Sequence, residues 1–146
     1  MQQINTTALG DFILAVEGGI PTAFGGHACM LWTENGHDVT ALEAVEKLAP
    51  LATTILSVGT CASYGGIPAG NPNPTGILSV AELTGLDTIN SPGCPTHPDW
   101  IVHTIASLIG GQAPSLDYYD RPTKHFGSRV HSNCPYREAE ETHTFG

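Results

Sequence analysis

Two cysteines stand where apolar segments end in glycine-rich turns. Cys61 lies in "GTCASYGG" and Cys94 lies in "SPGCPTHP". Glycine beside a cysteine lets backbone N–H groups approach a sulfur cluster closely, and such hydrogen bonds tune its reduction potential. Two thiolates cannot complete a four-cysteine cluster site, so further ligands would have to come from elsewhere. The alternative is a pair of cysteines in tight turns that bind nothing.

Near the C-terminus, "RVHSNCPYR" places His131 and Cys134 three residues apart. Two soft ligands at this spacing suit zinc or one corner of an iron–sulfur cluster. A surface histidine next to a buried cysteine produces the same pattern. Cys29, in "GGHACMLW", is predicted to be a buried, unreactive thiol. His97 is predicted to begin a helix rather than to bind a metal.

The elements that must position these residues alternate along the chain. Buried strands are predicted at Phe12–Val16 and Thr53–Val58, both covered on two faces, and a third strand in "DTINSPG". Helices are predicted in "DVTALEAVEKLAP", "LSVAELTG" and "PTHPDWIVHTIASLIGG", the first with a Thr40–Glu43 capping box. A last short strand is predicted in "TKHFGSRVH". This alternation predicts an α/β fold with a parallel sheet.

Three candidate residues each follow a different predicted strand. Glu17, Cys61 and Cys94 all come at or after the C-terminal end of their strand. Ligands of parallel α/β sheets bind at the carboxyl ends of the strands. We therefore expect these three side chains to share one edge of the sheet.

Composition narrows the class of protein. A chain of 146 residues, 40% apolar and 13% charged, is typical of one globular domain. The net charge of −9 argues against a nucleic-acid-binding surface. Four of the five basic residues nevertheless fall between Arg121 and Arg137. This basic run is either a solvated face or a contact surface for a partner.

Six stretches in order resemble the small, electron-transferring subunit of [NiFe] hydrogenases: "VEGGIPT", "GTCASYGGI", "NPNPTG", "PGCPTHPDW", "RPTKHFG" and "VHSNCP". The resemblance implies a flavodoxin-like parallel sheet with flanking helices that carries iron–sulfur clusters. This flavodoxin-like domain would span residues 1–146, with 121–146 leading toward a C-terminal cluster domain.

The resemblance also implies roles for individual residues. Cys61 and Cys94 would be two of the four ligands of a proximal [4Fe–4S] cluster, and Glu17 would lie next to it without being a ligand. His131 and Cys134 would be two of the four ligands of a distal [4Fe–4S] cluster. No residue of this chain would be catalytic, because the Ni–Fe centre belongs to the large subunit of the heterodimer.

The sequence departs from the family at both ends. Family members begin with a strand ending in C-x-x-C and continue past the H-x-x-C into a cysteine-rich region, which also supplies the medial cluster. We therefore expect an internal fragment without the first central strand, which would be unstable or aggregate when isolated. Gly66 stands where oxygen-tolerant members carry an extra cysteine, so the resemblance implies an ordinary proximal cluster and an oxygen-sensitive enzyme.

The expected partners are the large subunit and a downstream electron acceptor, such as a cytochrome b or another redox carrier, docking on the basic run. The location suggested by the H-x-x-C type is periplasmic and membrane-associated. The first alternative is the iron–sulfur subunit of an NADH–quinone oxidoreductase-like complex, which shares the "PGCP" turn but not "NPNPTG" or the H-x-x-C. Two others are a structural zinc domain using Cys61, Cys94, His131 and Cys134, and a metal-free interaction module.

Overall fold

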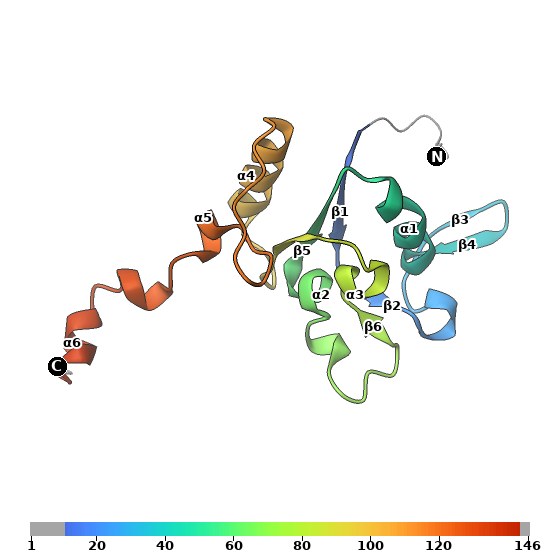
Figure 1. Ribbon diagram of the computed structural model, residues 1–146. Helices are drawn as coiled ribbons and strands as arrows, with labels where there is room; N and C mark the ends of the chain where they lie inside the picture. Colours follow the sequence, from blue (N-terminus) through green and yellow to red (C-terminus); the bar gives the residue numbers. More distant parts are fainter. Residues whose placement is uncertain (1–10, 144–146) are drawn as a thin grey trace.

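A three-stranded parallel sheet forms the centre of the molecule (Figure 1). The computed structural model describes residues 11–143, apart from the side chains at positions 133 and 140. The strands are β1 (Ile13–Glu17), β5 (Thr54–Val58) and β7 (Ile89–Ser91), in the order β1–β5–β7. Glu17 pairs with Val58, and Val58 pairs with Ser91. The predicted α/β fold with a parallel sheet is confirmed.

Helices cover both faces of this sheet. On one face α1 (Ala41–Leu48) and α3 (Val80–Thr84) pack on the apolar side chains of β1 and β5, for example Val45 and Val80 with Ile55. On the other face α4 (Pro98–Ile109) packs Ile101, Ile105 and Leu108 on Leu56, Val58 and Ile89. The short helix α2 (Gly59–Tyr64) follows β5 directly. The three predicted helices are thus present and enclose the sheet.

The helix starts follow their capping residues. Ser79 and Glu82 form a complete capping box at α3, with Glu82 N donating to Ser79 Oγ at 3.2 Å. At α1 only half of the predicted box forms: Glu43 N donates to Thr40 Oγ1 at 3.2 Å. The Glu43 carboxylate instead lies 2.9 Å from His37 Nε2. A neighbouring histidine thus competes with the backbone for this carboxylate.

The first predicted strand differs from the observed one. β1 begins at Ile13, and only Val16 is buried, whereas Ala15 and Glu17 are exposed. The prediction of a strand buried on both faces is therefore wrong for β1. The physical reason is that β1 is one of the two edge strands and its Ile13 and Ala15 side chains line an open hollow beside α4 instead of packed core.

The predicted strand in "TKHFGSRVH" is also wrong. This stretch forms the one-turn helix α5 (Thr123–Phe126) and, after Gly127, the 3-10 helix η5 (Val130–Asn133). The carbonyl of Pro122 accepts hydrogen bonds from the amides of His125 and Phe126, both at 3.0 Å. These local bonds satisfy the backbone that a strand would have offered to a neighbour.

Several elements were not predicted. The antiparallel hairpin β3 (Met30–Glu34) and β4 (His37–Thr40) turns at Asn35 and Gly36, whose φ angles of 51° and 81° fit a type I′ turn. Strands β2 (Ile20–Pro21) and β6 (Ile77–Leu78) form a second antiparallel pair. The remaining short helices are η2 (Ala23–Gly26), η3 (Ala49–Leu51), η4 (Ile67–Ala69) and α6 (Arg137–Glu141).

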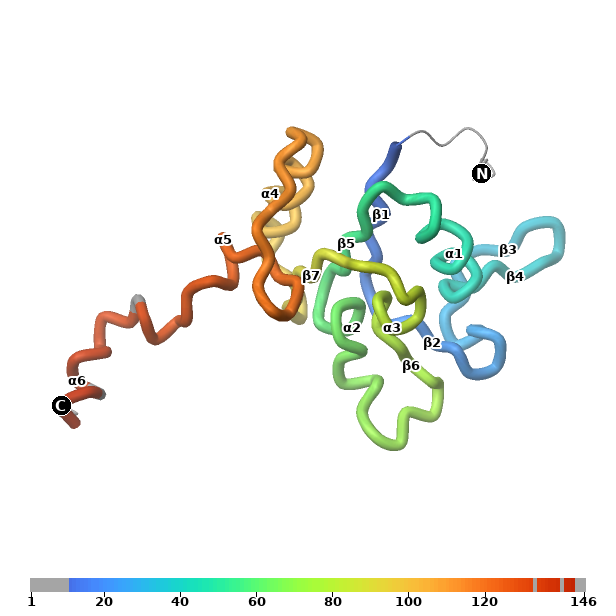
Figure 2. Tube along the Cα trace, in the orientation of Figure 1, coloured from blue at the N-terminus to red at the C-terminus, as the bar shows by residue number. Residues whose placement is uncertain are grey.

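Residues 127–143, which we call the arm, leave the body beyond α5 and extend away from the sheet (Figure 2). The arm carries η5 and α6. Among residues 11–143, no helix has the length and apolar character needed to cross a membrane.

Candidate metal centre

The carboxyl ends of the three parallel strands place Glu17, Cys61 and Cys94 at one edge of the sheet. Glu17 is the last residue of β1, Cys61 lies in the first turn of α2 just after β5, and Cys94 follows the end of β7. All three strands run in the same direction, so their ends point the same way. The expected convergence on one edge is confirmed at the level of the backbone.

Two hydrogen bonds hold the cysteine-bearing turns side by side. The Thr60 amide donates to the Gly93 carbonyl at 3.0 Å, and the Gly93 amide donates to Thr60 Oγ1 at 3.1 Å. Thr60 immediately precedes Cys61, and Gly93 immediately precedes Cys94. This reciprocal pair fixes two segments that are 33 positions apart in the sequence.

Glycines leave room around both turns. Gly66 has φ +62°, and a Cβ at this position would lie 2.6 Å from Cys61 Sγ. Gly93 has φ +155°, and a Cβ there would lie 2.7 Å from the Thr96 Cα. Any side chain at position 66 would require the Cys61 thiol to move, because the approach is closer than van der Waals contact.

The cysteines differ in exposure. All four are free thiols; Cys94 is exposed, and Cys61 is half-buried. Cys29 is half-buried and packs against the core under α1, so its predicted packing role is confirmed although its burial is incomplete. His97 caps α4, where its Nδ1 accepts a hydrogen bond from the Asp99 amide at 3.3 Å. Its predicted role at the helix start is confirmed.

The second candidate pair lies on the arm. His131 is exposed within η5, and Cys134 is half-buried directly after it, with the Cys134 amide donating to the His131 carbonyl at 3.2 Å. Within residues 11–143 no three or more side chains of histidine, cysteine, aspartate or glutamate converge in a way that could hold a metal ion. A zinc site made of Cys61, Cys94, His131 and Cys134 is therefore wrong for this structure, because the two pairs sit on separate parts of the chain. Each pair supplies two potential ligands.

Comparison with known proteins identifies the family. Residues 1–108 match the family described as "NADH ubiquinone oxidoreductase, 20 Kd subunit". The chain belongs to this family.

The relatives that the chain matches include hydrogenase small subunits. The chain is 38% identical to the periplasmic [NiFeSe] hydrogenase small subunit of Desulfomicrobium baculatum, over 99% of this chain and 51% of that protein. It is 40% identical to the periplasmic [NiFe] hydrogenase small subunit of Solidesulfovibrio fructosivorans, over 85% of this chain and 38% of that protein. The predicted resemblance to hydrogenase small subunits is confirmed.

Solved structures show the same likeness in three dimensions. A recombinant [NiFeSe] hydrogenase from Desulfovibrio vulgaris Hildenborough superimposes with a TM-score of 0.82 at 36% identity, over 90% of this chain and 52% of that one. The chain spans about half the length of these [NiFeSe] hydrogenase relatives and a smaller share of the [NiFe] one.

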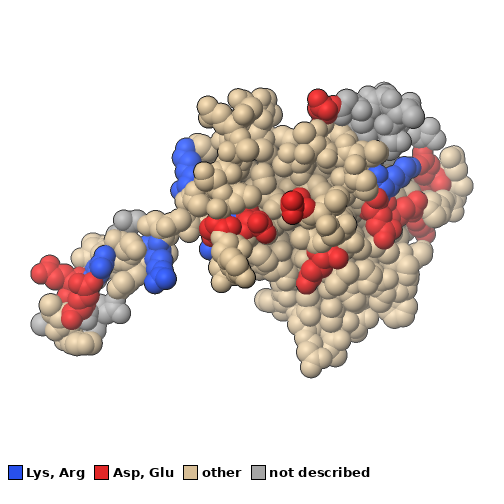
Figure 3. All heavy atoms as spheres, in the orientation of Figure 1, with Lys and Arg blue, Asp and Glu red and all other residues tan. Residues whose placement is uncertain are grey.

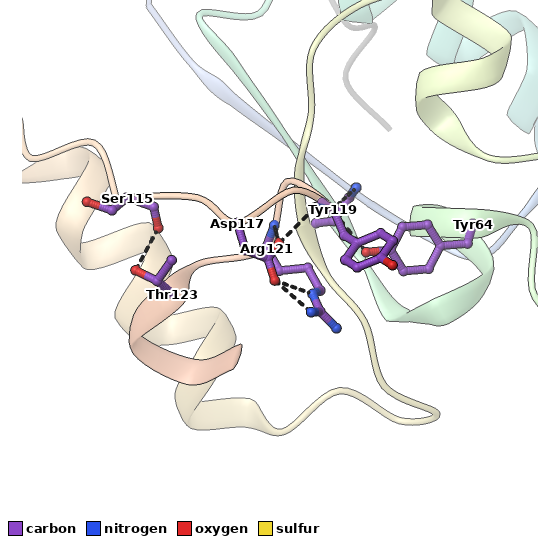
Figure 4. A network of polar contacts seen from close by, with 7 residues as sticks. Tyr64, Ser115, Asp117, Tyr119, Arg121 and Thr123 are labelled. Atoms are coloured by element: carbon purple, nitrogen blue, oxygen red, sulfur yellow. Dashed lines mark hydrogen bonds and ion pairs between the residues drawn. The ribbon is translucent and has the colours of Figure 1, made fainter. Parts of the chain in front are cut away.

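A network of hydrogen bonds that the sequence did not predict holds the helix that carries Cys61 (Figure 4). Tyr64 Oη, from the helix that carries Cys61, donates to the Tyr119 carbonyl at 3.0 Å, and Asn90 Nδ2 donates to the same oxygen at 3.1 Å. Arg121 donates two hydrogen bonds to Asp117 Oδ2, from Nε at 2.8 Å and from Nη2 at 2.6 Å. The network fastens α2 to the loop that leads toward the arm. The only sequence signal was the four-residue spacing of Asp117 and Arg121.

The network perturbs the acid–base behaviour of its members. The hydrogen bonds from Arg121 lower the pKa of Asp117, and the same interaction raises the pKa of Arg121. Burial raises the pKa of Tyr64. Each shift favours the protonation state that forms the observed bonds at neutral pH, so the loop keeps these contacts until acid protonates Asp117.

Proposed function

We propose that this chain is the electron-transfer small subunit, or part of one, of a [NiFe]-type hydrogenase. The observation that carries the proposal is the Thr60–Gly93 hydrogen-bond pair, which aligns the Cys61 and Cys94 turns at the carboxyl edge of the sheet. The identity to hydrogenase small subunits over most of the chain supports the same function. The Ni–Fe centre would lie on the partner large subunit, where H2 yields two protons and two electrons.

Cys61 and Cys94 would hold a proximal [4Fe–4S] cluster, together with two ligands from elsewhere. The donor set fits, since thiolates are the usual ligands of such clusters. A [4Fe–4S] cluster takes up and releases one electron at a time. The residues of this chain would bind it, exclude side chains from its surroundings through Gly66 and Gly93, and place Glu17 beside it at the sheet edge. With glycine at position 66, we also propose an oxygen-sensitive enzyme.

His131 and Cys134 would provide two of the four ligands of a distal [4Fe–4S] cluster. An imidazole and a thiolate three residues apart in one turn suit this role, and their position on the arm keeps them apart from the sheet-edge pair. In the proposed arrangement residues 1–146 form the flavodoxin-like part, and 121–146 lead toward a separate cluster domain.

The electron acceptor, a cytochrome b or another redox carrier, would dock near the arm. Figure 3 shows basic side chains on the arm and where it joins the body, together with acidic side chains at the far end of the arm. Two members of the predicted basic run are already neutralised, since Arg121 pairs with Asp117 at 2.6 Å and Arg137 pairs with Glu141 at 2.7 Å. Docking would therefore depend on Arg129 more than on these two. A periplasmic, membrane-associated location would fit such an acceptor.

The proposal is tested by tagging the gene in its native host and purifying the product without oxygen. We expect iron and acid-labile sulfide in the protein, a nickel-containing partner subunit, and H2-dependent reduction of benzyl viologen. Cys61→Ser and Cys94→Ser should each lower the iron content and abolish dye reduction.

The matched control is Cys29→Ala, which removes a thiol that packs on the core rather than at the sheet edge. It should leave iron content and dye reduction unchanged. Zinc in place of iron, or purification without a nickel protein, would contradict the proposed function.

A further inference from the structure

A polar hollow of about 370 Å³ lies between α4 and residues 112–125. Its lining includes His103, Lys124 and His125, with Ser115 and Thr123 beside them. None of the proposed cluster ligands lines it, and neither does any aspartate or glutamate among the described residues. The hollow is thus separate from the metal centre and carries basic groups without an acidic one.

Three nitrogen-bearing side chains meet at this hollow. Lys124 Nζ lies within hydrogen-bond distance of His103 Nε2, and the rings of His103 and His125 meet edge to face with centroids 5.4 Å apart. The close approach requires the His103 Nε2 to accept from the lysine ammonium, so two further ammonium protons stay available. Three groups that can each donate to an anion therefore come together from two elements, α4 and α5.

His125 is held in place from its other side. Trp100 stacks on its ring with centroids 5.9 Å apart, and Phe126 packs edge-on to the same tryptophan at 4.9 Å. Because α5 has only one turn, these aromatic contacts rather than helix length fix the ring. The His125 ring is thus positioned before any ligand arrives.

The electrostatic environment of His125 matches this arrangement. Its pKa is lowered mainly by burial, and further by the positive charges that His103 and Lys124 can carry. A bound anion would offset the repulsion among these groups and favour the protonated imidazole.

We propose that this hollow binds a phosphate-sized oxyanion, phosphate or sulfate, through Lys124 Nζ, the His125 ring and the His103 Nδ1, the ring nitrogen that does not accept from Lys124. Its volume lies in the range of small-ligand pockets and leaves room for accompanying water. Lysine is a common phosphate-binding residue, and charge-assisted donors of this kind make the stronger hydrogen bonds. The Thr123 hydroxyl is already used, since it donates to the Ser115 carbonyl at 3.2 Å, so the three basic groups provide the main recognition. The proposal does not depend on the hydrogenase function.

Equilibrium dialysis of the purified protein against radiolabelled inorganic phosphate tests this site, with ionic strength held constant by chloride. We expect one saturable site per chain, weakened about tenfold or more by Lys124→Met because a charged donor is lost. Lys47→Met is the matched control, since Lys47 lies exposed on α1 on the other side of the sheet. It should bind phosphate as tightly as the parent protein.

Histidine NMR on ring-labelled protein provides the second readout. Phosphate should raise the pKa of His125, and His103→Gln should reduce that response while leaving the fold intact, since His103 is exposed. Equal phosphate binding by the Lys124→Met protein and its parent would overturn the proposal. So would a His125 pKa that is the same in phosphate and in chloride.

Discussion

The sheet edge and the arm each present two candidate ligands, but they are built in opposite ways. At the sheet edge, Cys61 and Cys94 come from turns 33 positions apart, joined by the bonds between Thr60 and Gly93. On the arm, His131 and Cys134 are near neighbours linked by one backbone bond within a single turn. The first pair exists only when the sheet has folded, whereas the second needs only local structure.

This difference predicts how each pair responds to mutation. A change in the backbone around Cys61 should lower the free energy of unfolding of the whole domain, because these turns follow the core strands β5 and β7. Perturbing the arm should change its own ligands and little else, because its backbone bonds, such as Arg137 N to Cys134 O, join close neighbours. The following predictions test this contrast, beginning with the largest expected effect.

Gly66→Ala should have the largest effect. The new methyl group would lie 2.6 Å from Cys61 Sγ, on a backbone with φ +62°. Strain and contact together should lower the free energy of unfolding by about 2–4 kcal/mol and make the Cys61 thiol react faster with iodoacetamide. Urea unfolding and mass spectrometry of the alkylated thiol measure the two effects.

Gly111→Ala is the control for this comparison. Gly111 has φ +72° but nothing within 4 Å of the added methyl group, so it should cost only the backbone strain, about 1–2 kcal/mol. If both variants lose equal stability, the contact between position 66 and Cys61 contributes nothing.

Thr60→Val should have an intermediate effect. It removes the acceptor of the Gly93 amide while keeping a similar shape, at a cost of about 1–2 kcal/mol. Hydrogen exchange at the Gly93 amide should accelerate, whereas exchange on the arm should not change. Thr33→Val, which removes an exposed bond to Asp38 within the β3–β4 hairpin, should leave the Gly93 amide protected. An unchanged Gly93 exchange rate in Thr60→Val would show that this hydrogen bond does not hold the two turns together.

Acid should loosen the link between the two regions locally. Because the pKa of Asp117 is lowered in the folded state by Arg121, its contribution is complete above the unfolded pKa near 4 and is lost as the pH falls through the folded value. The Tyr119 and Arg121 amides, both donating to Asp117 Oδ1 at 3.0 Å, should report this transition by NMR. Asp117→Asn should abolish the titration of both amides; a titration that persists there would assign it to another group.

Ser57→Ala should have the smallest effect. Ser57 Oγ in β5 is buried and has no hydrogen-bond partner in the described structure. Removing an unsatisfied hydroxyl should leave the free energy of unfolding unchanged or raise it by up to about 1 kcal/mol. Thermal unfolding measures this, and a clear loss of stability would reveal a partner for the hydroxyl.

The positions of Cys61 and Cys94 at the carboxyl end of the sheet could be predicted from the sequence, because strands and the turns that end them have recognisable residue patterns. An apolar run predicted β5, the stretch "DTINSPG" predicted β7, and the glycine turns after them placed Cys61 and Cys94 at one edge. The burial of β1 was not predictable because an apolar run does not reveal whether a helix covers each face of the strand. The Asn35–Gly36 hairpin carried a strong turn signal that was overlooked.

Two other features could not be predicted from residue patterns: one is a local helical turn, and the other is a tertiary contact. The stretch "TKHFGSRVH" contains residues compatible with a strand, but Pro122 accepts the amides of His125 and Phe126 and starts a helical turn. The bond from Tyr64 to the Tyr119 carbonyl joins positions 55 apart. Neither residue type nor spacing could have paired them.

The central claim is that Cys61 and Cys94 serve one metal site and that His131 and Cys134 serve another. The most direct test is electron paramagnetic resonance of the reduced, anaerobically purified natural protein and four single variants. We predict that Cys61→Ser and Cys94→Ser remove the same cluster signal, while His131→Ala and Cys134→Ala remove a different one. Loss of one common signal in all four variants, or of none, would contradict the account.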